Sequence, residues 1–528
     1  MKKKAYSKSE LNNMSKEDLI ALVMANQEAI SLFEERIAMM QSQQFGRKTE
    51  RIECLDQMSI FNEAEELHRD EVEEPDVEEI VIRRKRPAGK REEQLEGVPS
   101  RIEHYEIPEE ELIQIFGENG WKRLPDEISR VVEIIPSQHE VVERRIAVYA
   151  GKKTDKIVKA KHPKKLFPGS LCSPSMLAAV MNGKYTNGMP LYRIAQELER
   201  NDIKIEKRNL ANWVIWGAER YLSLMTDRLH QELLKSPVVH ADETPCWVSK
   251  DDRPANSKSF MFVYRTGELN KGKPIILYDY QKTRNGDHVQ DFLERYRGYL
   301  MTDAFSGYHK VDRLEEHITV AHCWAHARRD FADAIKMMPK SGGSKQARKN
   351  TVAHTALVKI KAIYKLEESL ADLSPEDRLK ARKKDIAPDV DAFFTWVKEQ
   401  KLESIASQKI REGLQYCINQ EKYLRVFLED GNVPIDNSAA ERAIRPFTVG
   451  RNNWKLIDTI HGAQSSAIIY SLVETAKANN LKVYEYLKYL LSEIPQHMDD
   501  TDLSFLDDLL PWSEKLPEEC RKKVNNRK

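Results

Sequence analysis

Three carboxylates, each in a short motif of its own, are the residues of this chain best suited to do chemistry. Asp242 follows the largely apolar run 238–241, Asp303 follows the run 299–302, and Glu441 lies near the start of a helix-like segment. Phosphodiester cleavage needs an activated water or 3′-hydroxyl and stabilisation of the leaving oxygen, and two divalent cations about 4 Å apart supply both. Mg²⁺ prefers oxygen ligands and retains several waters, so a few carboxylates suffice. The acids predict a DNA-cutting and joining enzyme with two Mg²⁺ (or Mn²⁺) ions.

Each acid also has a local interpretation that involves no chemistry. Asp303 precedes Ala-Phe-Ser-Gly and would suit the start of a turn. Ser438 and Glu441 have the spacing of a capping box, in which Glu441 would serve the start of its helix. Glu441 and Arg445 would also suit an i,i+4 surface pair. Glu474, on a predicted downstream helix, is an alternative third ligand.

Two other polar residues flank the first acid. Successive side chains of a strand point to opposite faces, which places His240 and Asp242 on one face and Glu243 on the other. Asp242 and Asp303 lie at the ends of two strands that are neighbours in the predicted sheet. We therefore expect Asp242 rather than Glu243 to bind metal.

A second cluster, residues 322–326, contains a Cys-x-x-His pair in Cys323 and His326. Such a pair can ligate zinc, but no second pair has suitable spacing, so no structural zinc is expected. We expect basic side chains beside the metals to contact DNA phosphates, with a solvated helix surface as the alternative. These DNA-binding candidates are His326, Arg328, Arg329, Arg442, Arg445, Arg451 and Lys455.

The elements that must position the first two acids are predicted strands between residues 237 and 330. Tight connections join the first three strands, which favours antiparallel neighbours, and a helix before the fourth permits a parallel crossover. The first and fourth strands then lie side by side, with Asp242 and Asp303 at their ends. The order predicts an α/β chain with a ribonuclease-H-like core. The strands are expected at residues 238–241, 260–264, 275–280, 299–302 and 318–322.

The rest of the chain divides by pattern into further units. A heptad seam near the N-terminus predicts a coiled coil and hence a homo-oligomer, although a helix packed on its own domain would give the same pattern. Two apolar helix faces around Asn201-Asp202 suit a helix-turn-helix, a motif that also occurs in cores that never meet DNA. The expected boundaries are 1–50 (zipper helix), 51–105 (charged linker), 106–165 (small β-rich unit with strands near 131–135 and 141–145), 166–232 (helix-turn-helix-like domain), 233–480 (catalytic domain with a helical insertion at about 333–430) and 481–528 (helical segment and tail).

The composition of the chain indicates its class and its cellular location. It has 528 residues, no formal net charge and 41% hydrophobic residues, so several domains and no global nucleic-acid signal are expected. Its six cysteines form no Cys-x-x-Cys pair and are expected to be free thiols. No apolar run approaches the roughly 20 residues that span a bilayer, and the N-terminus lacks a signal-peptide core. We therefore expect a cytoplasmic protein without a membrane partner.

Short blocks in a fixed order over most of the chain resemble the transposases of the IS66 group of bacterial insertion sequences. The blocks are Gln44-Phe45-Gly46-Arg47-Lys48, Lys184-Tyr185, Pro190-Leu191-Tyr192-Arg193, His240-Ala241-Asp242-Glu243-Thr244, Thr302-Asp303, Gly307-Tyr308, Cys323-Trp324-Ala325-His326-Ala327-Arg328-Arg329, Asn437-Ser438-Ala439-Ala440-Glu441-Arg442-Ala443 and Ile469-Tyr470-Ser471-Leu472-Val473-Glu474-Thr475-Ala476-Lys477.

The resemblance implies a DDE triad of Asp242, Asp303 and Glu441 that binds metal. It also implies cleavage at terminal inverted repeats, joining to target DNA on the nucleoid, and accessory proteins of the same element. One departure is clear, because residues 106–160 lack the four cysteines of the zinc module that such proteins usually carry. Two alternatives remain: a ribonuclease-H-like structure-specific nuclease without strand transfer, and an inactive DNA-binding relic.

Overall fold

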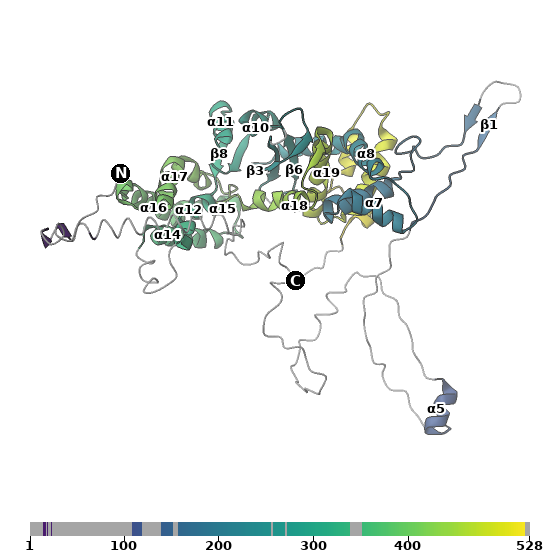
Figure 1. Ribbon diagram of the computed structural model, residues 1–528, viewed down its shortest axis with the longest axis horizontal. Coiled ribbons are helices and arrows are strands. Elements are labelled where there is room, and N and C mark those ends of the chain that lie inside the picture. The colour runs from purple at the N-terminus through teal and green to yellow at the C-terminus, as the bar shows by residue number, and fades with distance from the viewer. Residues whose placement is uncertain are drawn as a thin grey trace. The chain divides into compact units, whose positions relative to one another are not determined.

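The computed structural model describes six stretches of the chain and a few residues between 14 and 23 (Figure 1). The chain forms two compact units, residues 1–48 with 162–522 and residues 49–161 with 523–528, and each is described by itself. The predicted zipper helix and charged linker fall almost wholly outside the described residues. The described stretches are 108–118, 139–150, 157–254, 257–269, 272–337 and 351–522.

A five-stranded mixed sheet lies at the centre of the larger unit, in the order β6-β5-β3-β7-β8. β3 pairs antiparallel with β5 and β5 antiparallel with β6, whereas β3–β7 and β7–β8 are parallel. The predicted strands, neighbours and directions are confirmed. The bounds are β3 (Val238–Cys246), β5 (Ser259–Thr266), β6 (Ile276–Gln281), β7 (Gly298–Thr302) and β8 (Ile318–His322).

β3 is longer than the apolar run that predicted it. It pairs with β5 from Val239 to Cys246, but with β7 only over Val238, Val239 and His240. The polar residues after Ala241 stay extended because β5 satisfies their backbone groups on one side. β7 ends at Thr302, so the sheet opens between these strands at the level of Asp242.

Helices flank the sheet and close its core. α10 (Gly286–Phe292) and α11 (Ser306–Leu314) lie in the connections on either side of β7. α19 (Ile460–Ala478) packs on β6, where Thr475 Oγ1 donates to Ile276 O at 2.8 Å. α18 (Ser438–Trp454) packs on β3 and β5. After α19 the chain continues through α20 (Val483–Glu493), η6 (Ile494–His497), η7 (Ser504–Leu509) and η8 (Glu518–Cys520), and β4 (Val248–Lys250) pairs with β9 (Ile457–Thr459).

The predicted helix pair before the sheet is present as α7 (Leu191–Arg200) and α8 (Lys207–Gly217). Asp202 in the turn between them has φ 62°, a left-handed conformation that short polar residues tolerate. The buried residues of these helices belong to the same hydrophobic core as the sheet. The neighbouring helices are α6 (Pro174–Met181), η1 (Asn182–Thr186), η2 (Ala218–Leu222) and α9 (Ser223–Leu233).

A run of helices follows β8 directly and begins at Trp324, earlier than the start near residue 333 that the sequence suggested for a helical insertion. Its helices pack around a second hydrophobic core, in which the Trp324 ring lies 5.4 Å from Phe393 and 6.1 Å from Phe427. Its helices are α12 (Trp324–Met337), α14 (Val352–Glu368), α15 (Pro375–Ala381), η3 (Arg382–Ile386), α16 (Ala387–Glu399), η4 (Leu402–Ser404), α17 (Gln408–Leu424) and η5 (Val426–Leu428).

The second unit contains α5 (Glu109–Phe116) and a hairpin of β1 (Val148–Ala150) and β2 (Ile157–Lys159) among its described residues. The strand predicted at residues 141–145 is absent, which corrects that expectation. Val141 is 97% exposed, and an alternating run forms a strand only where a neighbour covers it. Residues 131–135, the other predicted strand, lie outside the described part.

Two composition-based expectations can be compared with the structure. The five cysteines in the described residues are free and buried: Cys172, Cys246, Cys323, Cys417 and Cys520. Among the helices of the described stretches, none combines the length and apolar character needed to cross a membrane.

Candidate active site

The three predicted carboxylates come from three different elements that meet at the opening between β3 and β7. Asp242 lies in the middle of β3, Asp303 directly follows β7, and Glu441 lies in the first turn of α18. Burial raises the pKa of Asp242 well above its usual range, and the charges of Glu243, Asp303 and Glu441 raise it further. Several acids that disfavour one another's charge form a site that a divalent cation would stabilise.

Asp303 also serves the turn that follows β7. Its Oδ1 accepts a hydrogen bond from the backbone N–H of Phe305 at 3.0 Å. Its side chain remains 26% exposed, so part of the carboxylate stays accessible. The turn interpretation and the metal interpretation are therefore compatible, because the turn holds the carboxylate in one orientation.

Glu441 does not form the capping box that its spacing suggested. The N-cap residue of α18 is Asn437 rather than Ser438, and the Asn437 side chain makes no capping hydrogen bond. Glu441 instead faces α12, where its Oε1 lies 3.9 Å from His326 Nε2. Glu474, the alternative third ligand, lies in α19 on the β6 side of the sheet and pairs with Lys477 at 2.8 Å.

Asn437 connects the helix of Glu441 to the strand of Asp242. Its side-chain Nδ2 donates to Ala241 O at 2.8 Å, at the point where β3 has lost β7 as a neighbour. Its Oδ1 lies 2.8 Å from His240 Nδ1, and since Oδ1 can only accept, the imidazole donates. Burial lowers the pKa of His240 to about 4, so the ring is neutral. The backbone N–H of Asn437 donates to Cys323 Sγ at 3.1 Å.

Glu243 is bound by partners that the sequence did not reveal. Its side chain is 1% exposed, and it accepts hydrogen bonds from Tyr308 Oη at 2.5 Å and Arg284 Nε at 2.6 Å. Arg284 also lies 3.9 Å from Asp303 Oδ2 and stacks 3.9 Å above the Phe305 ring. No spacing rule links residues 243, 284 and 308, so only the fold identifies them.

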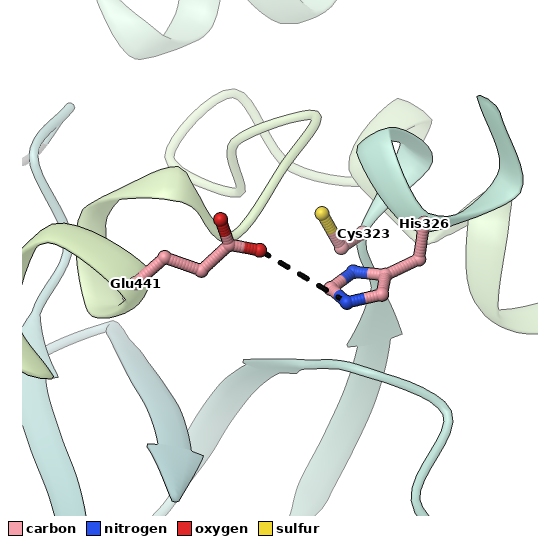
Figure 2. A group of neighbouring side chains, drawn as sticks. All are labelled: Cys323, His326 and Glu441. Carbon is pink, nitrogen blue, oxygen red and sulfur yellow. Dashed lines mark ion pairs between the residues drawn. The ribbon is translucent and has the colours of Figure 1, made fainter. Parts of the chain in front are cut away.

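Cys323 and His326 lie at the start of α12, opposite Glu441 (Figure 2). Burial raises the pKa of Cys323, and burial together with the Arg329 charge lowers the pKa of His326 to about 4. His326 is therefore neutral at pH 7. Beside DNA it would offer a hydrogen bond rather than the positive charge that a basic cluster suggested.

Two of the predicted DNA-contacting arginines bind partners in their own chain. Arg442 Nη2 contacts both carboxylate oxygens of Glu268, at 2.8 and 2.7 Å. Arg451 Nη1 donates to Thr244 Oγ1 at 3.1 Å and to Pro245 O, which fastens α18 to the end of β3. The remaining candidates are Arg328 and Arg329, half-buried on α12, Arg445, half-buried on α18, and Lys455, exposed at the end of α18.

Comparison with known proteins identifies the family of this chain. The family model described as Transposase IS66 family matches residues 169–465, which include all three carboxylates. The chain belongs to the IS66 transposase family. The IS66 C-terminal element matches residues 471–512, and a region described as Transposase C of IS166 homeodomain matches residues 32–106. The resemblance inferred from the short motifs is confirmed.

Two relatives of this IS66-family chain come from Sinorhizobium fredii (strain NBRC 101917 / NGR234). Uncharacterized protein y4qI is 27% identical over 396 residues, covering 73% of this chain and 70% of the relative. Uncharacterized protein y4hP is 24% identical over 402 residues, covering 75% and 72%. Because neither name states an activity, the chemistry must be argued from the site itself.

Proposed function

We propose that this transposase cleaves DNA at the ends of its insertion sequence and joins the freed ends to target DNA. Asp242, Asp303 and Glu441 would be the carboxylate ligands of two Mg²⁺ or Mn²⁺ ions. The observation that carries the proposal is the placement of three acids by β3, the turn after β7 and the first turn of α18. Burial and the charges of Glu243, Asp303 and Glu441 raise the pKa of Asp242, in keeping with their closeness. The sheet order, with an antiparallel β5 beside β3 and parallel β7 and β8, also suits a ribonuclease-H-like core.

The protein's own residues would orient the ligands. Asp242 is held by β3, Asp303 by its turn and Glu441 by α18, so the carboxylates converge without a large rearrangement. Bound ions would activate water and then the 3′-hydroxyl, and would stabilise the leaving oxygen. Because burial favours the protonated form of Asp242, its carboxyl must release a proton as it becomes a ligand.

DNA would be bound by surfaces outside the carboxylate cluster. At the start of α8, Lys207, Arg208 and Asn209 are exposed. In a helix-turn-helix the first residues of the second helix contact base edges in the major groove. We therefore include α7 and α8 in the proposed contact with the terminal inverted repeats. Pairing of protomers through residues 1–50 and accessory proteins of the element remain part of the proposal.

The direct test is Asp303→Asn in an assay that joins pre-cleaved donor ends to target DNA in Mg²⁺. We expect joining to fall by more than about 100-fold, since even partners outside the metal's ligands cost 10- to 100-fold. DNA binding should be retained. Glu474→Gln is the matched control, because it neutralises a buried acid outside the cluster and should keep joining.

The same assay separates the rival functions. A nuclease without strand transfer would cut the ends in Mg²⁺ but would not join pre-cleaved ends. A DNA-binding relic would do neither, and acid-to-amide changes would leave its DNA binding unaltered. If Asp303→Asn still joins donor ends at the wild-type rate, the assignment of the metal ligands is wrong.

A further inference from the structure

A cluster with different chemistry shares one residue with the proposed catalytic site. One ligand atom each from Cys323, His326 and Glu441 lie within 4.8 Å of one another. Figure 2 shows the thiol, the imidazole and the carboxylate gathered between α12 and α18. The proposed DNA chemistry uses neither the thiol nor the closeness of the imidazole to Glu441.

The donor set suits a softer ion than Mg²⁺. Thiolate, imidazole and carboxylate are the three ligand types of zinc, and sites with three protein ligands leave a fourth position for water. Mg²⁺ takes oxygen ligands and has little affinity for sulfur or imidazole. A transition ion would therefore prefer this cluster, whereas Mg²⁺ would prefer the three carboxylates.

The geometry is close to that of a bound site. At the tetrahedral angle of zinc, bonds of about 2.0–2.3 Å place two ligand atoms of one ion roughly 3.3–3.6 Å apart. His326 Nε2 and Glu441 Oε1 are already 3.9 Å apart, and the whole set spans 4.8 Å. Side-chain rotations that move these ligand atoms by about 1 Å would bring all three to bonding distance of one ion.

The surroundings of the cluster also favour a ligand. Cys323 Sγ accepts a hydrogen bond from the backbone N–H of Asn437 at 3.1 Å, an interaction that stabilises a thiolate. Among the described residues, the buried His326 Nδ1 has no hydrogen-bond partner, so this ring nitrogen is available as the ligand atom as well as Nε2. The residues close to Cys323 and His326 in the sequence include no second ligand pair with suitable spacing. The fold supplies the third ligand from α18, 115 positions after His326 (441 minus 326).

We propose that Cys323, His326 and Glu441 form a binding site for a soft divalent transition ion such as Zn²⁺. Occupation of this site removes Glu441 from Asp242 and Asp303 and so inhibits Mg²⁺-dependent cleavage and joining. The binding half stands without any enzymatic activity, and the inhibitory half rests on the proposed function.

Binding is tested with Co²⁺ titrated into the metal-free full-length chain without DNA. We expect the near-ultraviolet charge-transfer band of a cobalt–thiolate bond. Cys323→Ser should abolish the band, whereas Cys417→Ser, which changes another buried thiol, should retain it. Thermal unfolding of both variants checks that they are folded. No band in the wild type, or an undiminished band in Cys323→Ser, overturns the site.

The two other ligands are tested by affinity. His326→Gln and Glu441→Gln should each raise the Kd for Co²⁺ by at least about 10-fold. An unchanged Kd for Co²⁺ in Glu441→Gln would show that Glu441 is not a ligand of this site. It would overturn the proposal that the transition ion takes Glu441 from the Mg²⁺ site, even with the cobalt–thiolate band present.

The inhibitory half is tested by adding Zn²⁺ to joining reactions in excess Mg²⁺. Wild type should lose most of its activity, and Cys323→Ser should keep a larger fraction of its own zinc-free activity. Equal loss in both proteins overturns inhibition through this site. If no protein joins DNA but the cobalt band follows the expected pattern, the proposed function fails and the metal site stands. If the protein joins DNA but shows no cobalt–thiolate band, the metal site fails and the proposed function stands.

Discussion

Asp242 occupies a position where its charge is costly in the absence of metal. Its pKa is raised, so between its usual value and the folded value the native state binds more protons than the unfolded state. Stability of the metal-free protein therefore falls as pH rises through that window, and the loss is complete above the folded pKa. Asp251 is an opposite case, because hydrogen bonds from Arg253 lower its pKa.

The first prediction follows from that sign. At pH 8 without metal, Asp242→Asn should raise the melting temperature by roughly 2 °C, since about 1 kcal/mol corresponds to a few degrees in a unit of this size. The gain should shrink toward pH 4, where the wild-type carboxyl is protonated. Calorimetry with and without Mg²⁺ measures it: Mg²⁺ should stabilise wild type more than the variant. Asp251→Asn should lower the melting temperature, and a destabilised Asp242→Asn would contradict the argument.

At the scale of elements, the contact between β3 and α18 sets the position of Glu441 relative to Asp242. β7 leaves β3 after His240, and the Asn437 side chain binds the next carbonyl, Ala241 O. Asn437 also begins the helix that presents Glu441, and its backbone binds Cys323. One buried amide thus sets the distance between the strand of Asp242 and the helix of Glu441. Asn437 is a positioning residue in the proposed mechanism.

Loss of that amide should loosen the metal site more than the fold. We expect Asn437→Ala to raise the Mg²⁺ concentration for half-maximal joining by about 10- to 100-fold, with partial rescue by Mn²⁺. Asn453→Ala, which removes the bond from Asn453 Nδ2 to Gly188 O at the other end of α18, is the control and should leave the Mg²⁺ requirement unchanged. A lower rate with an unaltered Mg²⁺ requirement would indicate a structural role alone.

At the scale of the larger unit, two hydrophobic cores meet at the sheet. The core of the insertion includes Val238, Met301 and Ala321, which belong to β3, β7 and β8. In Figure 1 the insertion helices lie beside β8, whereas α19 lies beside β6. Because sheet residues contribute to both cores, we expect the insertion and the sheet to unfold together rather than in sequence.

Truncation of a buried ring tests that coupling. Phe393→Ala should cost about 3–5 kcal/mol, the usual range for a fully buried phenylalanine. Denaturant unfolding followed by tryptophan fluorescence and circular dichroism should show one transition, shifted as a whole. Leu373→Ala, at a position that is 38% exposed, should change stability by less than about 0.5 kcal/mol. A separate early transition in Phe393→Ala would show that the insertion unfolds alone.

Local sequence patterns predicted much of the fold and two of the three acids of the candidate site. Apolar runs, tight connections and a helix before the fourth strand predicted the order and direction of five strands, and with them the closeness of Asp242 and Asp303. Helical periodicity predicted the insertion. The strand at residues 141–145 failed because alternation alone does not supply the neighbour that a strand needs.

The sequence by itself indicated the family through short motifs in a fixed order. It also predicted the sheet and the acids Asp242 and Asp303, because periodicity and short connections are properties of neighbouring residues. Only the tertiary structure decided how Glu441 meets His326 and Cys323, how Arg284 and Tyr308 hold Glu243, and how Asn437 replaces a missing strand partner. These contacts join residues tens to hundreds of positions apart. Their formation depends on how whole elements pack, and no spacing in the chain encodes it locally.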